Sequence, residues 1–241
     1  MSDGPRGDGP GGEAPVSAGP DLSERYAAVT EGIAEAFRLA GRTDEPPTLI
    51  VVTKFHPASL LRELVDLGVR HVGENRHQDA APKAAELADA PLTWHFVGQL
   101  QSNKAKAAAR YASAVHSVDR ASLVTALAGA DGALDVFLEV NLTDDPGRGG
   151  IDPSGVDALA EAVLATERLR LRGVMAVAPL DEEPRAAFAR LRGISERLRV
   201  LAPEATQISA GMSGDFAEAI AEGATHLRIG AAITGKRPGP P

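Results

Sequence analysis

A single lysine, Lys54, stands at the end of an apolar segment and is the first residue in the sequence that could do covalent chemistry. Five of the six residues from Thr48 to Thr53 are β-branched, which favours a buried parallel strand. Pro57 follows at a position suited to the first turn of a helix. An ammonium at such a strand end must be paired or solvated, or its amine can form a Schiff base with a carbonyl. The simpler interpretation is a solvated surface lysine.

Two stretches of small residues near the C-terminus predict an anion-binding site. They are SAGMSGD (209–215) and RIGAAITG (228–235), and each follows a predicted strand. Small residues let backbone N–H groups approach a phosphate closely, and barrels commonly hold a phosphate at this place. Ser213 also stands just ahead of a helix expected near Asp215, so it could merely cap that helix. The two loops together favour the phosphate.

Pyridoxal 5′-phosphate (PLP) requires a lysine and a phosphate-binding site at the same end of a barrel. Arg228, on the last predicted strand and pointing inward, could donate a hydrogen bond to the ring nitrogen of that cofactor. Because an arginine cannot be deprotonated, such a ring would be a weakened electron sink. The alternative for Arg228 is a structural ion pair with an acidic residue such as Glu139. Asn75 is either a cofactor contact or a helix cap, and His95 is either a ligand or a packed core residue.

Eight predicted strands alternate with helical patterns and would position these residues. The strands are expected at Thr48–Thr53, His71–Gly73, Leu92–Val97, Ala114–Ser117, Leu134–Asn141, Leu171–Val177, Thr206–Ser209 and Leu227–Gly230. An amphipathic helix from Asp21 to about Leu39 precedes them. Further helices are expected at Ala58–Leu67, Arg76–Ala88, Lys104–Ala109, Ala121–Ala128, Pro153–Thr166, Pro184–Leu201 and Phe216–Glu222.

This alternation predicts an α/β fold, a single closed (β/α)8 barrel with an additional N-terminal helix. The ending GKRPGPP leaves no room for an eighth crossover helix, so the leading helix should fill that place in the ring. An open doubly wound sheet is the competing architecture. Residues 1–20 are half Gly and Pro and are expected to be a disordered leader, with the barrel over 21–237 and a tail over 238–241.

The composition of the chain limits the classes of binding partner and the cellular compartment that are expected. The net charge of −8 argues against a nucleic-acid partner. No apolar run approaches the length of a membrane span and no signal peptide opens the chain, so a cytoplasmic protein is expected. The absence of cysteine excludes disulfides and thiolate metal sites, and the histidines form no metal-ligand pattern. Aromatic residues make up only 4% of the chain, which favours a monomer.

Seven collinear stretches give the chain a resemblance to the pyridoxal phosphate homeostasis protein family. They are VVTKFHP, VGENRHQDA, WHFVGQLQSNK, HSVDR, EVNLTDDPGRGG, LRGVMAVAP and ISAGMSGDFAEAIAEGATHLRIG. The similarity runs from about Leu22 to Arg237. The family fold resembles the barrel domain of bacterial alanine racemase, which agrees with the strand count.

The resemblance implies roles for individual residues. Lys54 corresponds to the lysine that holds PLP as an internal aldimine, Arg228 faces the pyridine nitrogen, and Asn75 is a polar contact beside the cofactor. The phosphate contacts correspond to Met212, Ser213, Gly214, Gly230 and Ala231. The family often has Thr where Ala231 stands, so one hydroxyl to the phosphate is expected to be lost while the backbone donor remains. Phe is common where Thr234 stands, and Lys where Arg148 stands.

Three functions then compete. The first is a carrier that buffers the PLP supply, with PLP-dependent apoenzymes as candidate recipients. The second is a PLP-dependent amino-acid racemase, which needs an acid/base group on each face of the substrate. Alanine-racemase-like enzymes bring the opposing tyrosine from a separate β-domain that this chain lacks, and Tyr26 and Tyr111 are expected on outer helices. The third is an aldolase or isomerase that uses Lys54 directly on a sugar phosphate.

Overall fold

Eight parallel strands close into a barrel in the computed structural model, which describes residues 19–145 and 147–236. Each strand pairs with the next along the chain, and β8 pairs back with β1 through Thr48↔His226 to Val51↔Ile229. The strands are β1 (Thr48–Val52), β2 (His71–Glu74), β3 (Thr93–Phe96), β4 (Ala112–Val118), β5 (Leu134–Glu139), β6 (Leu169–Met175), β7 (Gln207–Ser209) and β8 (His226–Ile229). The predicted barrel is confirmed, and the open doubly wound sheet is wrong.

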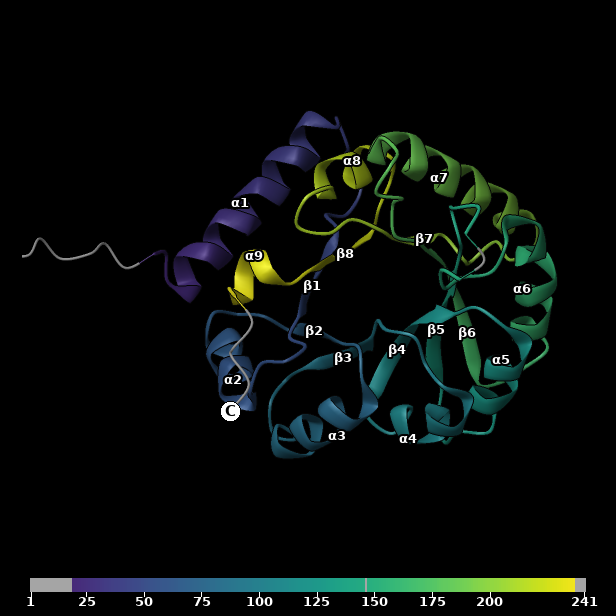
Figure 1. Cartoon of the computed structure of the whole chain (residues 1–241), viewed down its shortest axis with the longest axis horizontal. Coiled ribbons are helices and arrows are strands. Elements are labelled where there is room, and N and C mark those ends of the chain that lie inside the picture. Colours follow the sequence, from purple (N-terminus) through teal and green to yellow (C-terminus); the bar gives the residue numbers. More distant parts are fainter. Residues whose placement is uncertain (1–18, 146, 237–241) are drawn as a thin grey trace, which may run out of the picture.

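Helices form a ring outside the strands (Figure 1). They are α1 (Leu22–Leu39), α2 (Ala58–Asp66), α3 (His77–Glu86), α4 (Ala105–Ala108), α5 (Ala121–Ala128), α6 (Val156–Leu164), α7 (Pro184–Leu201), α8 (Phe216–Ala221) and α9 (Ala231–Thr234), with short 3₁₀ turns at η1 (Ser102–Lys104) and η2 (Pro153–Gly155). No helix in the described ranges is both long and apolar enough to cross a bilayer.

Helix α1 takes the place in the ring that the missing crossover helix would have filled. It lies alongside α8 and α9 (Figure 1), with Val29 and Ile33 buried on its inner face. A capping box at its start pairs the backbone N–H groups of Asp21 and Glu24 with each other's side-chain oxygens. The Nε of Arg25 donates to the carbonyl of Ile233 at 2.7 Å and so joins α1 to α9.

The expected ending without a helix needs correction, because α9 follows β8. Its four residues begin directly after Gly230, and a helix of one turn is too short to leave a periodic pattern. The expected tail lies outside the described residues, and so does all but the end of the expected leader.

The core has two parts. Outward-facing strand residues such as Val51 and Phe96 pack under the helices against residues such as Leu61 of α2. Inside the barrel, Ala114, Phe137 and Met175 form a separate small apolar cluster. The remainder of the described interior is unusually polar, since four of the six histidines in the sequence lie within or at the end of this space: His71, His95, His116 and His226.

Candidate functional site at the barrel mouth

Lys54 lies at the carboxyl end of β1, where strand and helix are joined by a short turn. Its side chain is exposed, and its Nζ lies 6.0 Å from the centroid of the Phe55 ring. Phe55 has a φ of +71°, the only positive φ at a non-glycine residue in the described chain. Such a conformation costs about 1–3 kcal/mol and persists only where the surroundings impose it. The backbone strain is therefore located directly beside the candidate nucleophile.

A buried polar cluster on the outer side of the sheet holds the residue before Lys54. The Oγ1 of Thr53 donates to Oε1 of Glu74 at 2.7 Å, and Nζ of Lys83 contacts the same oxygen at 2.7 Å. Lys83 also donates to the carbonyl of Thr53 at 3.0 Å. Glu74 is only 1% exposed, so the pair is desolvated. Lys83 was missed in the sequence because its partner lies nine positions away on a different element.

Asn75 follows β2 at the same mouth and has an unsatisfied group. Its Oδ1 is buried and has no hydrogen-bond partner among the described residues. Helix α3 starts at His77 with Arg76 as its N-cap residue and no side-chain capping bond, so Asn75 does not cap the helix. A buried amide oxygen without a donor is expected to be paired by a ligand or by water.

Arg228 points into the barrel, as the sequence predicted, and is almost fully buried. Its Nη1 donates to Oγ of Ser209 at 2.7 Å, and its Nη2 donates to the carbonyl of Ala176 at 2.9 Å. Burial lowers its pKa to about 10, against the opposing effect of Glu139 and Asp215, so the guanidinium stays charged at neutral pH. Three of its five N–H donors remain for another acceptor.

The expected alternative for Arg228, an ion pair with Glu139, is wrong. The carboxylate of Glu139 accepts instead from Nε2 of Gln99 at 2.9 Å, and no ion pair links it to Arg228 in the described chain. Burial and the nearby Asp119 raise the pKa of Glu139 to about 7, while Arg228 and the hydrogen bond from Gln99 act in the opposite direction.

The loop after β7 is shaped by Gly211, whose φ is +93°. A Cβ there would lie 2.8 Å from the side chain of Ala219, so only glycine fits. The backbone N–H of Met212 already donates to Oδ1 of Asp215 at 2.6 Å. Ser213 and Gly214 are exposed, and their N–H groups have no acceptor among the described residues.

Ser213 does not cap α8, so the capping interpretation is wrong. The N-cap residue is Asp215, which makes no side-chain capping bond to the helix. The loop after β8 lies beside β1, since a Cβ on Gly230 would be 3.3 Å from the carbonyl of Val52. Gly230 is the N-cap of α9, and Ala231 is its first residue. The two loops that the sequence singled out therefore follow adjacent strands at the mouth that holds Lys54.

The hydrogen-bonded histidines inside the barrel were missed by the sequence analysis. His71 of β2, His95 of β3 and His116 of β4 lie in line, and His116 reaches Ser209 beside Arg228. His95 was considered only as an isolated residue. Side chains point inward at every second position of a barrel strand. The position of each histidine within its predicted strand was therefore the signal that could have shown that all three face the interior.

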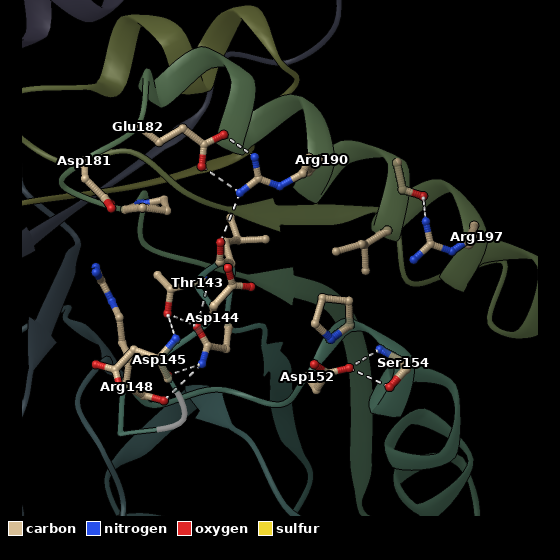
Figure 2. A pocket seen from close by; sticks show the side chains of 16 residues that line it. Thr143, Asp144, Asp145, Arg148, Asp152, Ser154, Asp181, Glu182, Arg190 and Arg197 are labelled. Carbon is tan, nitrogen blue, oxygen red and sulfur yellow. Dashed lines mark hydrogen bonds and ion pairs between the residues drawn. The ribbon is translucent and has the colours of Figure 1, made fainter.

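A separate cavity of about 1120 Å³ lies between the loop after β5 and helix α7 (Figure 2). Arg190 spans it, contacting the carboxylate of Glu182 and donating to the carbonyl of Leu142 at 3.0 Å. None of the predicted cofactor residues lines this cavity. No group of three His, Cys, Asp or Glu residues in the described chain is arranged to hold a metal ion.

Neither tyrosine faces the mouth. Tyr26 lies on α1, as expected, whereas Tyr111 lies in the turn before β4 and not on a helix. The Tyr111 ring stacks on His77 with a centroid separation of 5.8 Å and meets Trp94 edge-on, on the outer side of the sheet. Burial and the charge of Glu74 raise the pKa of Tyr111 well above its usual range. The described chain thus places no tyrosine opposite Lys54.

Comparison with known proteins identifies the family of this chain. The family model "alanine racemase, N-terminal domain" matches residues 33–238. The chain is 41% identical to the pyridoxal phosphate homeostasis protein of Mycobacterium tuberculosis over 93% of its length and 97% of the relative's. It is 43% identical to the protein of that name from Pseudomonas aeruginosa, over 90% of this chain and 96% of the other.

Solved structures show the same architecture. PipY of Synechococcus elongatus, solved with PLP bound, is 35% identical and superposes with a TM-score of 0.78, covering 89% of this chain and all of PipY. Alanine racemase from Corynebacterium glutamicum is 16% identical and shares the fold with a TM-score of 0.65, over 86% of this chain and 62% of the racemase. The chain therefore belongs to the pyridoxal phosphate homeostasis proteins, which are built on the alanine racemase N-terminal domain.

Proposed function

We propose that this protein binds PLP and serves the homeostasis of that cofactor as a carrier or buffer, with Lys54 as the attachment residue. The observation that carries the proposal is the convergence of an exposed lysine amine, a buried charged arginine and two small-residue loops at one barrel mouth. The relatives named for PLP homeostasis and the PLP-bound PipY structure support it.

The residues at the mouth fit PLP. When bound, the cofactor supplies an aldehyde that can link to an amine and a ring that can draw electrons from that link. Lys54 offers the amine in a solvent-exposed position. The Oδ1 of Asn75, beside the end of β2, has no hydrogen-bond donor among the described residues and could accept one from a bound molecule. Arg228 retains N–H donors for an acceptor such as a pyridine nitrogen, which it cannot protonate.

The phosphate contacts belong to the loops after β7 and β8. The free N–H groups of Ser213 and Gly214 would donate to phosphate oxygens, and Gly230 and Ala231 would contribute from the neighbouring strand. Met212 lies in the same loop, but its own N–H already donates to Asp215, so we expect its contribution to be smaller. Ala231 offers no side-chain hydroxyl.

A carrier fits this mouth better than a racemase does. Two-base racemisation needs a second acid/base group facing Lys54, and in the described chain both tyrosines lie outside the barrel. Lys54 is open to solvent, which favours exchange of the cofactor over controlled carbanion chemistry. We further propose that the protein works as a cytoplasmic monomer and that PLP-dependent apoenzymes receive the cofactor.

Absorbance and peptide mapping test the proposal. Purified protein with added PLP should show a visible absorption band that disappears in Lys54→Ala and persists in Lys106→Ala, an exposed lysine on α4. Borohydride reduction should fix the cofactor on the peptide that contains Lys54. A wild-type protein that stays colourless with PLP, or an adduct distributed over several lysines, would contradict it.

The carrier role has its own test. Holo-protein mixed with a PLP-dependent apoenzyme should lose its absorption band while the apoenzyme gains activity, and size-exclusion chromatography with light scattering should give the mass of one chain. Inversion of alanine at an ordinary enzymatic rate, followed by circular dichroism, would overturn the carrier in favour of a racemase. Lysine trapping by a sugar phosphate, and not by PLP, would favour the aldolase.

A further inference from the structure

A line of hydrogen bonds crosses the barrel interior from the start of β2 to Arg228. Nδ1 of His71 lies 3.0 Å from Nε2 of His95, and Nδ1 of His95 lies 2.9 Å from Nε2 of His116. Nδ1 of His116 lies 2.8 Å from Oγ of Ser209, which accepts from Nη1 of Arg228 at 2.7 Å. Ser209 and His116 are fully buried, while His71 is half-buried at the opposite end of the barrel.

Proton counting gives this line a direction. Arg228 can only donate, so the Oγ of Ser209 is an acceptor toward it. The hydroxyl proton of Ser209 then has one acceptor among the described residues, Nδ1 of His116. The Oγ of Ser209 has a second lone pair that could accept from an Nδ1–H of His116, but its buried hydroxyl proton would then have no acceptor among the described residues. Pairing that proton requires His116 to carry its own proton on Nε2 and to donate to Nδ1 of His95. By the same reasoning His95 carries its proton on Nε2 and donates to His71.

All three imidazoles must be neutral for the line to hold, because a histidine protonated on both nitrogens accepts nothing. Burial is the largest effect on each of them. It lowers the pKa of His95 to about 3, lowers that of His116 well below the usual value and lowers that of His71. The ring of His116 also stacks on Phe137, with 4.3 Å between centroids, which fixes its plane.

We propose that His71, His95, His116 and Ser209 form a directional hydrogen-bond relay whose function is to position the Arg228 guanidinium toward the ring of PLP. Ser209 and His116 are then positioning residues, because they act on the cofactor only through Arg228. The cofactor end of the proposal rests on the proposed function. The direction of the relay is a property of the protein alone.

The relay differs from ordinary core packing in what it requires of each side chain. Packing needs the volume of each side chain, whereas the relay needs an acceptor facing Ser209 and a donor facing the opposite way at His116. Glutamine can supply both, since its Oε1 accepts and its Nε2 donates, whereas phenylalanine keeps the ring and supplies neither. Ser117, the buried neighbour of His116 whose Oγ has no partner in the described chain, provides a matched control.

Nitrogen-15 NMR of the cofactor-free wild-type protein tests the direction without any variant. At pH 7 we expect a pyridine-like Nδ1 and a pyrrole-like Nε2 for His71, His95 and His116. A cationic ring or an Nδ1–H tautomer at His95 or His116 would overturn the relay. Because no PLP is present, this result stands whether or not the proposed function is right.

Cofactor binding tests the coupling to Arg228. We expect Ser209→Ala and His116→Phe to weaken PLP binding about tenfold and to shift the absorption band. Ser209→Ala removes the hydrogen bond to the charged Arg228, and His116→Phe removes the acceptor that orients the Ser209 hydroxyl. His116→Gln should retain most of the affinity, and Ser117→Ala should match the wild type. If Ser209→Ala and His116→Phe bind PLP as Ser117→Ala does, the relay has no positioning role. A wild-type protein that binds no PLP would refute the proposed function and leave the NMR test of direction intact.

Discussion

The strand end that carries Lys54 depends on one buried ion pair. Lys83 and Glu74 are 2.7 Å apart, with side chains 12% and 1% exposed, and both also bind Thr53. Removing one member of such a pair leaves an uncompensated buried charge. The cost in such cases is about 3–5 kcal/mol, whereas exposed pairs contribute about 0–1 kcal/mol.

We therefore expect Lys83→Met to lower the free energy of unfolding by about 3–5 kcal/mol, measured by urea denaturation. The double variant Glu74→Gln/Lys83→Met should recover more than half of this loss, because the stranded carboxylate is gone. Arg38→Ala, which removes the partner of the exposed Glu35, is the control and should change little. A loss in Lys83→Met no larger than that in Arg38→Ala would show that the pair does not hold this strand end.

The sequence revealed individual site residues better than their partners. Lys54 could be found because it interrupts an apolar segment, and Arg228 because its strand position turns it inward. The hydrogen bonds of Arg228 to Ser209 and Ala176 join three strands, and no local pattern records a contact across that separation. For the same reason the alternative interpretation of Arg228, an ion pair with Glu139, was wrong.

At the scale of elements, one glycine sets the spacing between the loops after β2 and β3. A Cβ on Gly98 would lie 2.4 Å from the carbonyl oxygen of Asn75 and 2.7 Å from its Cα. Neither backbone atom can move without shifting the loop, so Gly98 keeps Asn75 at the mouth. Gly98 stands in WHFVGQLQSNK, one of the stretches that carry the family resemblance, but the steric reason for the glycine is visible only in three dimensions.

Gly98→Ala should displace the Asn75 loop and weaken PLP binding, which we expect to measure as a several-fold rise in the dissociation constant together with NMR shifts at Asn75. Gly193→Ala is the matched control. Gly193 lies within α7 with no atom near the position of an added Cβ, so alanine there should stabilise the protein by about 0.5–1 kcal/mol. Unchanged affinity and unchanged Asn75 resonances in Gly98→Ala would contradict this account.

The order of elements was predictable because strand and helix patterns alternate with different periods. The barrel, its eight strands and the place of α1 were all correct. Helix α9 was not predicted, since four residues carry no periodicity. The polar interior was missed for another reason. Closure of the barrel brings His71 of β2, His95 of β3 and His116 of β4 together with Ser209 of β7 in the interior, and the separate strands do not show which of these side chains will meet.

For the whole molecule, this polar interior predicts how stability depends on pH. Burial lowers the pKa of His95 to about 3 and of His226 to about 4, and lowers that of His116 well below its usual value. Unfolded histidines titrate near pH 6.5, so below that pH the unfolded chain binds about three more protons at these positions. Stability is therefore fully present above pH 6.5 and is lost as the pH falls.

Glu139 opposes this trend. Its raised pKa of about 7 means that, between about pH 4.5 and 7, the folded state binds one proton that the unfolded state does not. This group alone makes the fold less stable as the pH rises through that window. Near pH 5.5 these four groups together leave the unfolded chain with about two more bound protons than the folded state, so their combined effect lowers the unfolding free energy by about 2.7 kcal/mol for each pH unit of acidification. The lowered pKa values of His56 and His71 act in the same direction.

Glu139→Gln separates the two contributions while keeping an oxygen to accept from Gln99. Without the opposing carboxyl group, the slope should steepen to about three protons, or about 4 kcal/mol per pH unit near pH 5.5. The variant should also be more stable than the wild type above pH 7, where the half-buried carboxylate is charged. Urea denaturation at half-unit intervals from pH 5 to 8 measures both effects. Equal slopes in the two proteins would show that Glu139 titrates normally, and a flat wild-type profile would show that the interior histidines do.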